Sequence, residues 1–142
     1  MTLSDDHAQK DLGVEEYDPL QSPDPAIWLD RDEDQRHALV LAYHLENEGD
    51  VFDLDNDDEG PNTTLHATIQ VVVENQLALG DETVLITMDR LLRQGLDRHD
   101  ALHAIGAVLF EVIRAERPQE DMRRYYRRLR KLTARRWRKG TY

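Results

Sequence analysis

Four of the six histidines in this 142-residue chain lie near the ends of helix-like segments, where their rings can meet. His44 is near the end of one segment, His66 is in the first turn of the next, and His99 and His103 are in the first two turns of a third. Residues four apart share a helix face, so His99 and His103 point the same way. Imidazole is a common ligand of zinc, iron and nickel. We therefore predict that these four histidines form a divalent-metal site.

Three polar residues near these histidines are candidates to support a metal site. Gln70 follows His66 by one helical turn, Glu74 follows it by two turns, and Asp100 comes directly after His99. Such side chains orient metal-bound histidines or act as a base toward metal-bound water. We predict this supporting role for Gln70, Glu74 and Asp100, with Glu74 or Asp100 as the base of any reaction. The alternative is that the histidines are boundary residues that flank apolar helix faces.

Two further metal-site patterns are incomplete in the sequence. Residues 99–103 resemble the His-Glu-x-x-His motif of zinc peptidases, but aspartate replaces the glutamate and no third-ligand pattern follows. Residues 48–62 form an acidic segment with alternating aspartates, as in a calcium loop. An EF-hand needs glycine and glutamate where this chain has Asp58 and Thr64. We expect neither a peptidase nor an EF-hand.

Other catalytic classes lack their essential residues. The chain has no cysteine, which excludes disulfides, thiolate metal sites and cysteine nucleophiles. Ser4 and Ser22 are its only serines, and both precede the first predicted helix. There is no glycine-rich phosphate loop. A serine hydrolase or a P-loop enzyme is therefore not expected, and the sequence leaves open whether the protein is an enzyme.

The basic C-terminal segment suggests a second kind of function. The net charge is −11, with −20 in residues 1–113 and +9 in residues 114–142. The basic candidates for partner binding are Arg123, Arg124, Arg127, Arg128, Arg130, Lys131, Arg135 and Arg136. Arginine neutralises phosphate, and the aromatic residues interspersed there can stack on bases. The alternative to the metal hypothesis is thus a non-enzymatic protein that binds nucleic acid or an acidic protein. An anionic membrane, or the acidic segments of the chain itself, are further candidates for the partner.

The elements that position these residues are predicted to be helices. Asp30 with Glu33 has the pattern of a capping box, and we expect the first helix to run from there to residues 47–49. Apolar spacing predicts a second helix over residues 63–79, and Asp81 and Asp97 are expected to cap a third and a fourth. Pro118 is expected at the first position of a fifth, basic helix. Very short connections make the middle helices antiparallel, which brings the histidines to one end.

These elements predict an all-α fold, a bundle of four or five helices. We expect a disordered acidic arm over residues 1–27, a helical core domain over 28–116 and a basic helix or extension over 117–142. Trp28 is expected to dock the arm onto the core. No apolar run is long enough to span a bilayer, and residues 1–10 have no signal-peptide pattern, so we expect a cytoplasmic protein.

Three strings carry a resemblance to a known family. They are AYH at 42–44, LHATIQVVVENQLALGD at 65–81 and GLDRHDALHAIGAVL at 95–109. Together they resemble a small bacterial family of helical proteins of unknown function, over about residues 28–113. The resemblance implies a shared fold and the motif positions Tyr43, His44, His66, Glu74, Asn75, Gln76, Arg98, His99 and His103. This chain departs at Gln70, where the family pattern has histidine, so an amide carbonyl replaces a potential ligand. The resemblance implies no activity.

Overall fold

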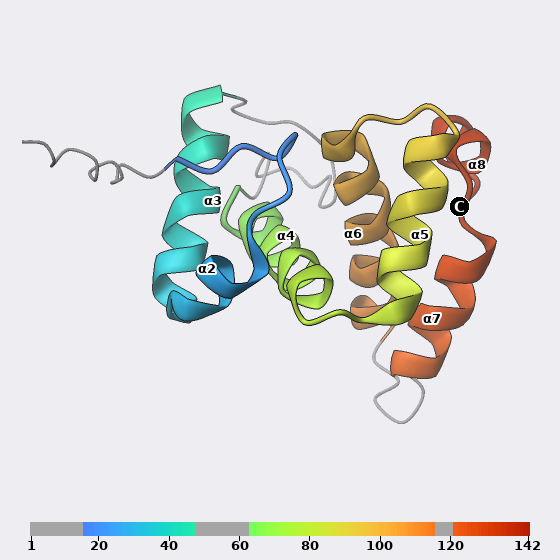
Figure 1. The fold of residues 1–142 in the computed structure, drawn as a ribbon. Coiled ribbons are helices and arrows are strands. Elements are labelled where there is room, and N and C mark those ends of the chain that lie inside the picture. Colours follow the sequence, from blue (N-terminus) through green and yellow to red (C-terminus); the bar gives the residue numbers. More distant parts are fainter. Residues whose placement is uncertain (1–15, 48–62, 116–120) are drawn as a thin grey trace, which may run out of the picture.

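The computed structural model describes residues 16–47, 63–115 and 121–142, and every regular element within them is a helix (Figure 1). The predicted all-α class is therefore confirmed. The helices are α2 (Pro25–Asp30), α3 (Glu33–Asn47), α4 (Thr63–Ala78), α5 (Glu82–Arg93), α6 (Arg98–Arg114), α7 (Asp121–Lys131) and α8 (Ala134–Lys139). None of them is both long and apolar enough to cross a bilayer.

The centre of the bundle is α6, which contacts α4, α5 and α7 (Figure 1). The helices α3 and α2 pack against α4. Residues 101–109 of α6 are all buried, and four of the nine are alanine or glycine, which lets neighbouring helices approach closely. At Gly106 a Cβ atom would lie 3.0 Å from Cγ2 of Ile69 on α4. The two helices therefore approach each other closely at this point.

The predicted boundaries of the middle helices are confirmed. The carboxylate of Asp81 accepts a hydrogen bond from the Val84 amide, and that of Asp97 accepts one from the Asp100 amide. Gly80 follows α4 with a φ of +81°, a conformation that glycine adopts at little cost. The chain therefore reverses within a few residues, as the spacing predicted.

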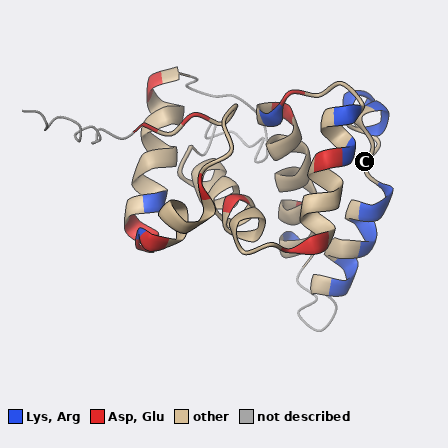
Figure 2. Ribbon diagram, viewed as in Figure 1, with Lys and Arg blue, Asp and Glu red and all other residues tan. Residues whose placement is uncertain are grey.

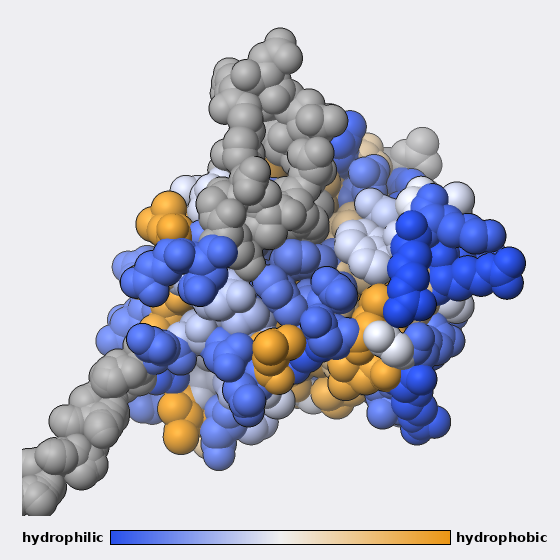
Figure 3. All heavy atoms as spheres, turned by 90° about the horizontal axis from the view of Figure 1, so that it is seen from above, coloured by the Kyte–Doolittle hydropathy of each residue, from blue (hydrophilic) through white to orange (hydrophobic). Residues whose placement is uncertain are grey.

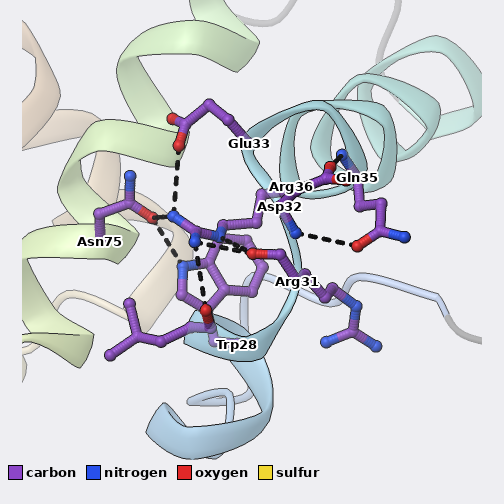
Figure 4. Close-up of polar contacts among 8 residues, drawn as sticks. Trp28, Arg31, Asp32, Glu33, Gln35, Arg36 and Asn75 are labelled. Carbon is purple, nitrogen blue, oxygen red and sulfur yellow. Dashed lines mark hydrogen bonds and ion pairs between the residues drawn. The ribbon is translucent and has the colours of Figure 1, made fainter.

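The N-terminal part differs from the prediction in two ways. Residues 16–27 do not form a disordered arm, because Tyr17 is buried and α2 begins at Pro25, whose fixed φ suits a first helical position. The capping box also lies two residues further on. The Asp32 carboxylate accepts from the Gln35 amide at 2.8 Å, and the Gln35 side chain accepts from the Asp32 amide at 2.9 Å (Figure 4). Residues 1–15 lie outside the described ranges.

The basic C-terminal segment is not a single helix. It breaks after Lys131, and the Thr133 hydroxyl caps the short α8. Tyr125, Leu129 and Leu132 belong to the buried core, so this segment packs as part of the bundle rather than as an extension. Leu129 and Leu132 are therefore not available for contact with a membrane. Pro118 and the acidic segment 48–62 lie outside the described residues.

Candidate metal centre

The four predicted histidines come together at one end of the bundle. The ring centroids of His99 and His103 are 4.3 Å apart, and those of His44 and His66 are 6.3 Å apart. Tyr43 lies between the two pairs, with its ring centroid 5.9 Å from His44 and 5.7 Å from His99. The end of α3 and the first turns of α4 and α6 thus supply one cluster. Its role as a metal site stays a prediction.

Burial affects the protonation of one member of this cluster, His103. His44, His66 and His103 are buried, and His99 is half-buried. Burial, together with smaller effects of the nearby charges of His99, His44 and His66, lowers the pKa of His103 from 6.5 to about 3. His103 is therefore neutral at pH 7, which is the form that binds metals. The charges of the other three histidines thus act on His103.

The ring spacing is close to that of a shared ion. Two imidazoles on one tetrahedral zinc, with Zn–N of about 2.0–2.1 Å, have centroids about 5 Å apart. The two measured separations, 4.3 and 6.3 Å, lie on either side of this value. Within the described ranges, however, no three His, Asp or Glu side chains are arranged as they stand to hold an ion. The rings would have to turn about their side-chain bonds to ligate together.

A buried hydrogen-bond chain leads away from His44. Its Nε2 lies 3.2 Å from Oε1 of Gln70, and the Gln70 amide donates to the Tyr17 hydroxyl at 2.9 Å. Tyr17 in turn donates to the Glu74 carboxylate. Glu74 receives two guanidinium hydrogen bonds from Arg98, at 2.8 and 2.9 Å. Gln70 is thus in contact with a histidine, whereas Glu74 reaches the cluster only through two other side chains.

Three consecutive polar residues in α4 hold three other parts of the chain. Glu74 binds Arg98 at the start of α6. The carbonyl of Asn75 accepts from the Trp28 indole at 2.9 Å and from Arg36 of α3 at 3.0 Å (Figure 4). Trp28 therefore docks the N-terminal segment, as predicted.

The third of these residues, Gln76, faces the C-terminal part. Its carbonyl accepts from the Tyr125 hydroxyl of α7 at 2.6 Å. The Glu-Asn-Gln string therefore has a structural role in fixing α2, α3, α6 and α7 to α4. Sequence reasoning found these positions but missed Tyr17, because no local pattern marks that tyrosine as buried.

One predicted candidate, Asp100, and one further histidine, His37, lie outside the cluster. Asp100 is exposed, and its backbone amide takes part in the Asp97 cap. Its role as a base stays a prediction. His37, two turns before His44, is paired with the Thr68 hydroxyl at 3.1 Å and was not expected in the cluster.

The basic residues of α7 and α8 form a separate surface at the opposite end from α3 (Figure 2). We call it the basic face, and its predicted members are exposed except for the half-buried Arg124 and Arg128. Figure 3 shows strongly hydrophilic side chains gathered at the α8 end. Tyr125 is fully buried, and Tyr126 donates to Asp81 of the bundle at 2.5 Å. The Tyr125 ring is therefore not available for base stacking, whereas Tyr126 and Trp137 are half-buried, and stacking by these two stays a prediction.

No protein-family model matches this chain, and no curated protein or solved structure matches it either.

Proposed function

We propose that this protein binds one divalent transition-metal ion through His44, His66, His99 and His103. The observation that supports the proposal is the convergence of four imidazoles from three helices, with ring centroids 4.3 Å apart in one pair and 6.3 Å in the other. Buried polar rings are costly to keep in a helical core, and coordination to an ion offsets that cost. The neutral state of His103 at pH 7 favours the same role.

The donor set suggests which metals fit. Four imidazoles without thiolate or carboxylate suit zinc, iron or nickel. Four protein ligands complete a tetrahedral zinc site, as in structural centres. Iron or nickel with higher coordination would keep positions for water. The proposal therefore covers binding, and a reaction would need an ion with such an open position.

The test is a calorimetric titration of chelator-treated, untagged protein with zinc. We expect saturable binding near one equivalent, and at least a tenfold loss of affinity in His103→Ala, in line with the cost of disturbing a ligand shell. His37→Ala is the matched control, since His37 is paired with Thr68 away from the cluster. Far-UV circular dichroism checks that the variants fold. Absence of saturable binding, or wild-type affinity in His103→Ala, would contradict the proposal.

The basic face supports a second candidate function, binding of a nucleic-acid backbone. Within the described residues no ion pair joins an Asp or Glu side chain to this face, although Arg128 donates to the main-chain oxygen of Tyr142 at 3.0 Å; Arg93 on α5, by contrast, pairs with Asp89. Because Tyr125 is buried and the arginines are the most exposed groups of this face, we expect contacts mainly to phosphates.

Fluorescence anisotropy with a single-stranded RNA tests this candidate. Arg127→Gln should lower the salt dependence of binding by about one phosphate contact, and Arg31→Gln, at the far end of the molecule, should leave it unchanged. Binding to polyglutamate but not to RNA would instead indicate an acidic protein partner and overturn the nucleic-acid candidate.

A further inference from the structure

A directional chain of hydrogen bonds connects a buried ion pair to one of the four histidines. We propose that this chain holds His44 as its Nε2–H tautomer, so that Nδ1 is its metal-binding atom, and that Tyr17 and Gln70 are the positioning residues. The choice of ligand atom rests on the proposed metal binding. The tautomer is a property of the protein before any ion is bound.

The direction of the chain is set at its buried end. Arg98 always carries its charge and only donates hydrogen bonds, and it gives two of them to Glu74. A carboxylate held in this way is ionised and only accepts. The Glu74 and Arg98 side chains are 1% and 9% exposed, so water does not compete for these positions. Any hydroxyl next to Glu74 must therefore donate to it.

Tyr17 is that hydroxyl. Burial raises its pKa well above the ordinary value of 10.0, and the charge of Glu74 raises it further, so the phenol keeps its proton. The proton points to Glu74, which leaves the phenol oxygen as an acceptor. The Gln70 group 2.9 Å from this oxygen must consequently be its amide nitrogen.

The orientation of Gln70 then determines the state of His44. With its nitrogen directed at Tyr17, the amide presents Oε1 to His44 Nε2 at 3.2 Å. A carbonyl oxygen only accepts, so Nε2 carries the hydrogen. In the neutral ring the lone pair is then on Nδ1. A hydrogen bond at one ring nitrogen commonly fixes which nitrogen binds metal.

The N-terminal segment therefore helps to position His44. Arg98 also donates to the backbone carbonyl of Pro19 at 3.0 Å, so one guanidinium holds both Glu74 and the segment that carries Tyr17. Loss of the Tyr17 hydroxyl would remove the acceptor that orients Gln70. The amide could then rotate, and His44 would no longer be restricted to one tautomer.

The experiment is long-range ¹H–¹⁵N correlation NMR of the histidine rings in chelator-treated protein above pH 7. In the wild type we expect a protonated Nε2 and an unprotonated Nδ1 for His44. Tyr17→Phe should convert this single form into a mixture. Tyr125→Phe is the matched control. It also removes a buried phenol, but that phenol donates to Gln76 of α4, away from the histidines.

Each outcome bears on a separate part of the inference. An Nδ1–H tautomer in the wild type, or an unchanged tautomer in Tyr17→Phe, would overturn it. Zinc should then shift the Nδ1 resonance of His44, and a shift of Nε2 instead would refute the assignment of the ligand atom. If the tautomer is as expected but zinc shifts no ring nitrogen, the metal-binding proposal fails while the positioning role of Tyr17 and Gln70 stands.

Discussion

Replacement of Glu74 by glutamine is expected to destabilise the protein more than any other single charge removal within the described residues. Glu74→Gln keeps the size of the side chain but leaves the Arg98 guanidinium buried opposite a neutral group. The pair is closely spaced, at 2.8 Å, and its side chains are 1% and 9% exposed. Breaking such a buried pair costs about 3–5 kcal/mol, because the remaining charge is not solvated.

The chain provides a matched control for this substitution. Arg93 and Asp89 form an ion pair at 2.7 Å, but their side chains are 78% and 59% exposed. Asp89→Asn removes the same charge in the same way, and solvent limits its cost to about 0.5 kcal/mol. The two pairs have almost equal lengths, so the difference in cost isolates the effect of burial.

Urea unfolding followed by circular dichroism measures both variants. A domain of this kind has about 5–15 kcal/mol of stability in total, so Glu74→Gln should visibly lower the unfolding midpoint. Replacing both residues, as Glu74→Leu with Arg98→Met, should recover part of the loss, because no buried charge remains. Equal losses in Glu74→Gln and Asp89→Asn would refute the reasoning.

Three further predictions concern packing, pH and the N-terminal segment. Gly106→Ala should lower the free energy of unfolding in urea by about 1 kcal/mol, because the 3.0 Å contact of the new Cβ with Ile69 outweighs the gain in helix propensity. A stabilised variant would show that the Ile69 side chain can move aside. The pKa of His103 is lower in the folded protein (about 3) than in the unfolded chain (6.5), so its contribution to stability is complete above pH 6.5 and is lost as the pH falls toward 3. The slope from this group is at most about 1.4 kcal/mol per pH unit, and chelator-treated His103→Gln should show a flatter profile. Trp28→Phe keeps most of the buried ring but removes the 2.9 Å hydrogen bond to Asn75, and should cost about 1 kcal/mol in the same assay, whereas no loss would mean that the bond is replaced.

The features that were predictable from sequence are those set by local interactions. Asp81 and Asp97 cap their helices through amides three residues away, so the signal and its cause lie in one short string. The short connections at Gly80 and Gly95 predicted antiparallel middle helices. That geometry was enough to bring the histidines together before any side chain was placed.

The features that were missed depend on contacts distant in sequence. Tyr17 is held by Gln70 and Glu74, more than fifty positions away, and nothing in its own acidic, proline-rich surroundings marks it as buried. The capping box was placed at Asp30 because Glu33 has the right spacing, whereas the chain uses Asp32 and Gln35. Two capping patterns of equal quality occur side by side in the sequence, and only packing decides which one forms.

The basic segment shows how charge can hide an apolar stripe. Tyr125, Leu129 and Leu132 recur at helical spacing and are all buried against the bundle. The arginines between them indicate an exposed, basic face. The inward face can be predicted from the same string, because these three residues recur at helical spacing.

The most direct test of the metal proposal is the metal content of untagged protein as purified, measured by elemental mass spectrometry together with a thermal melt before and after chelation. We predict close to one equivalent of zinc, iron or nickel, and a lower melting temperature once the chelator removes it. The His103→Ala protein should contain little metal, and its melting temperature should not respond to chelator. Wild-type protein that contains no metal and melts identically with and without chelator would contradict the central claim.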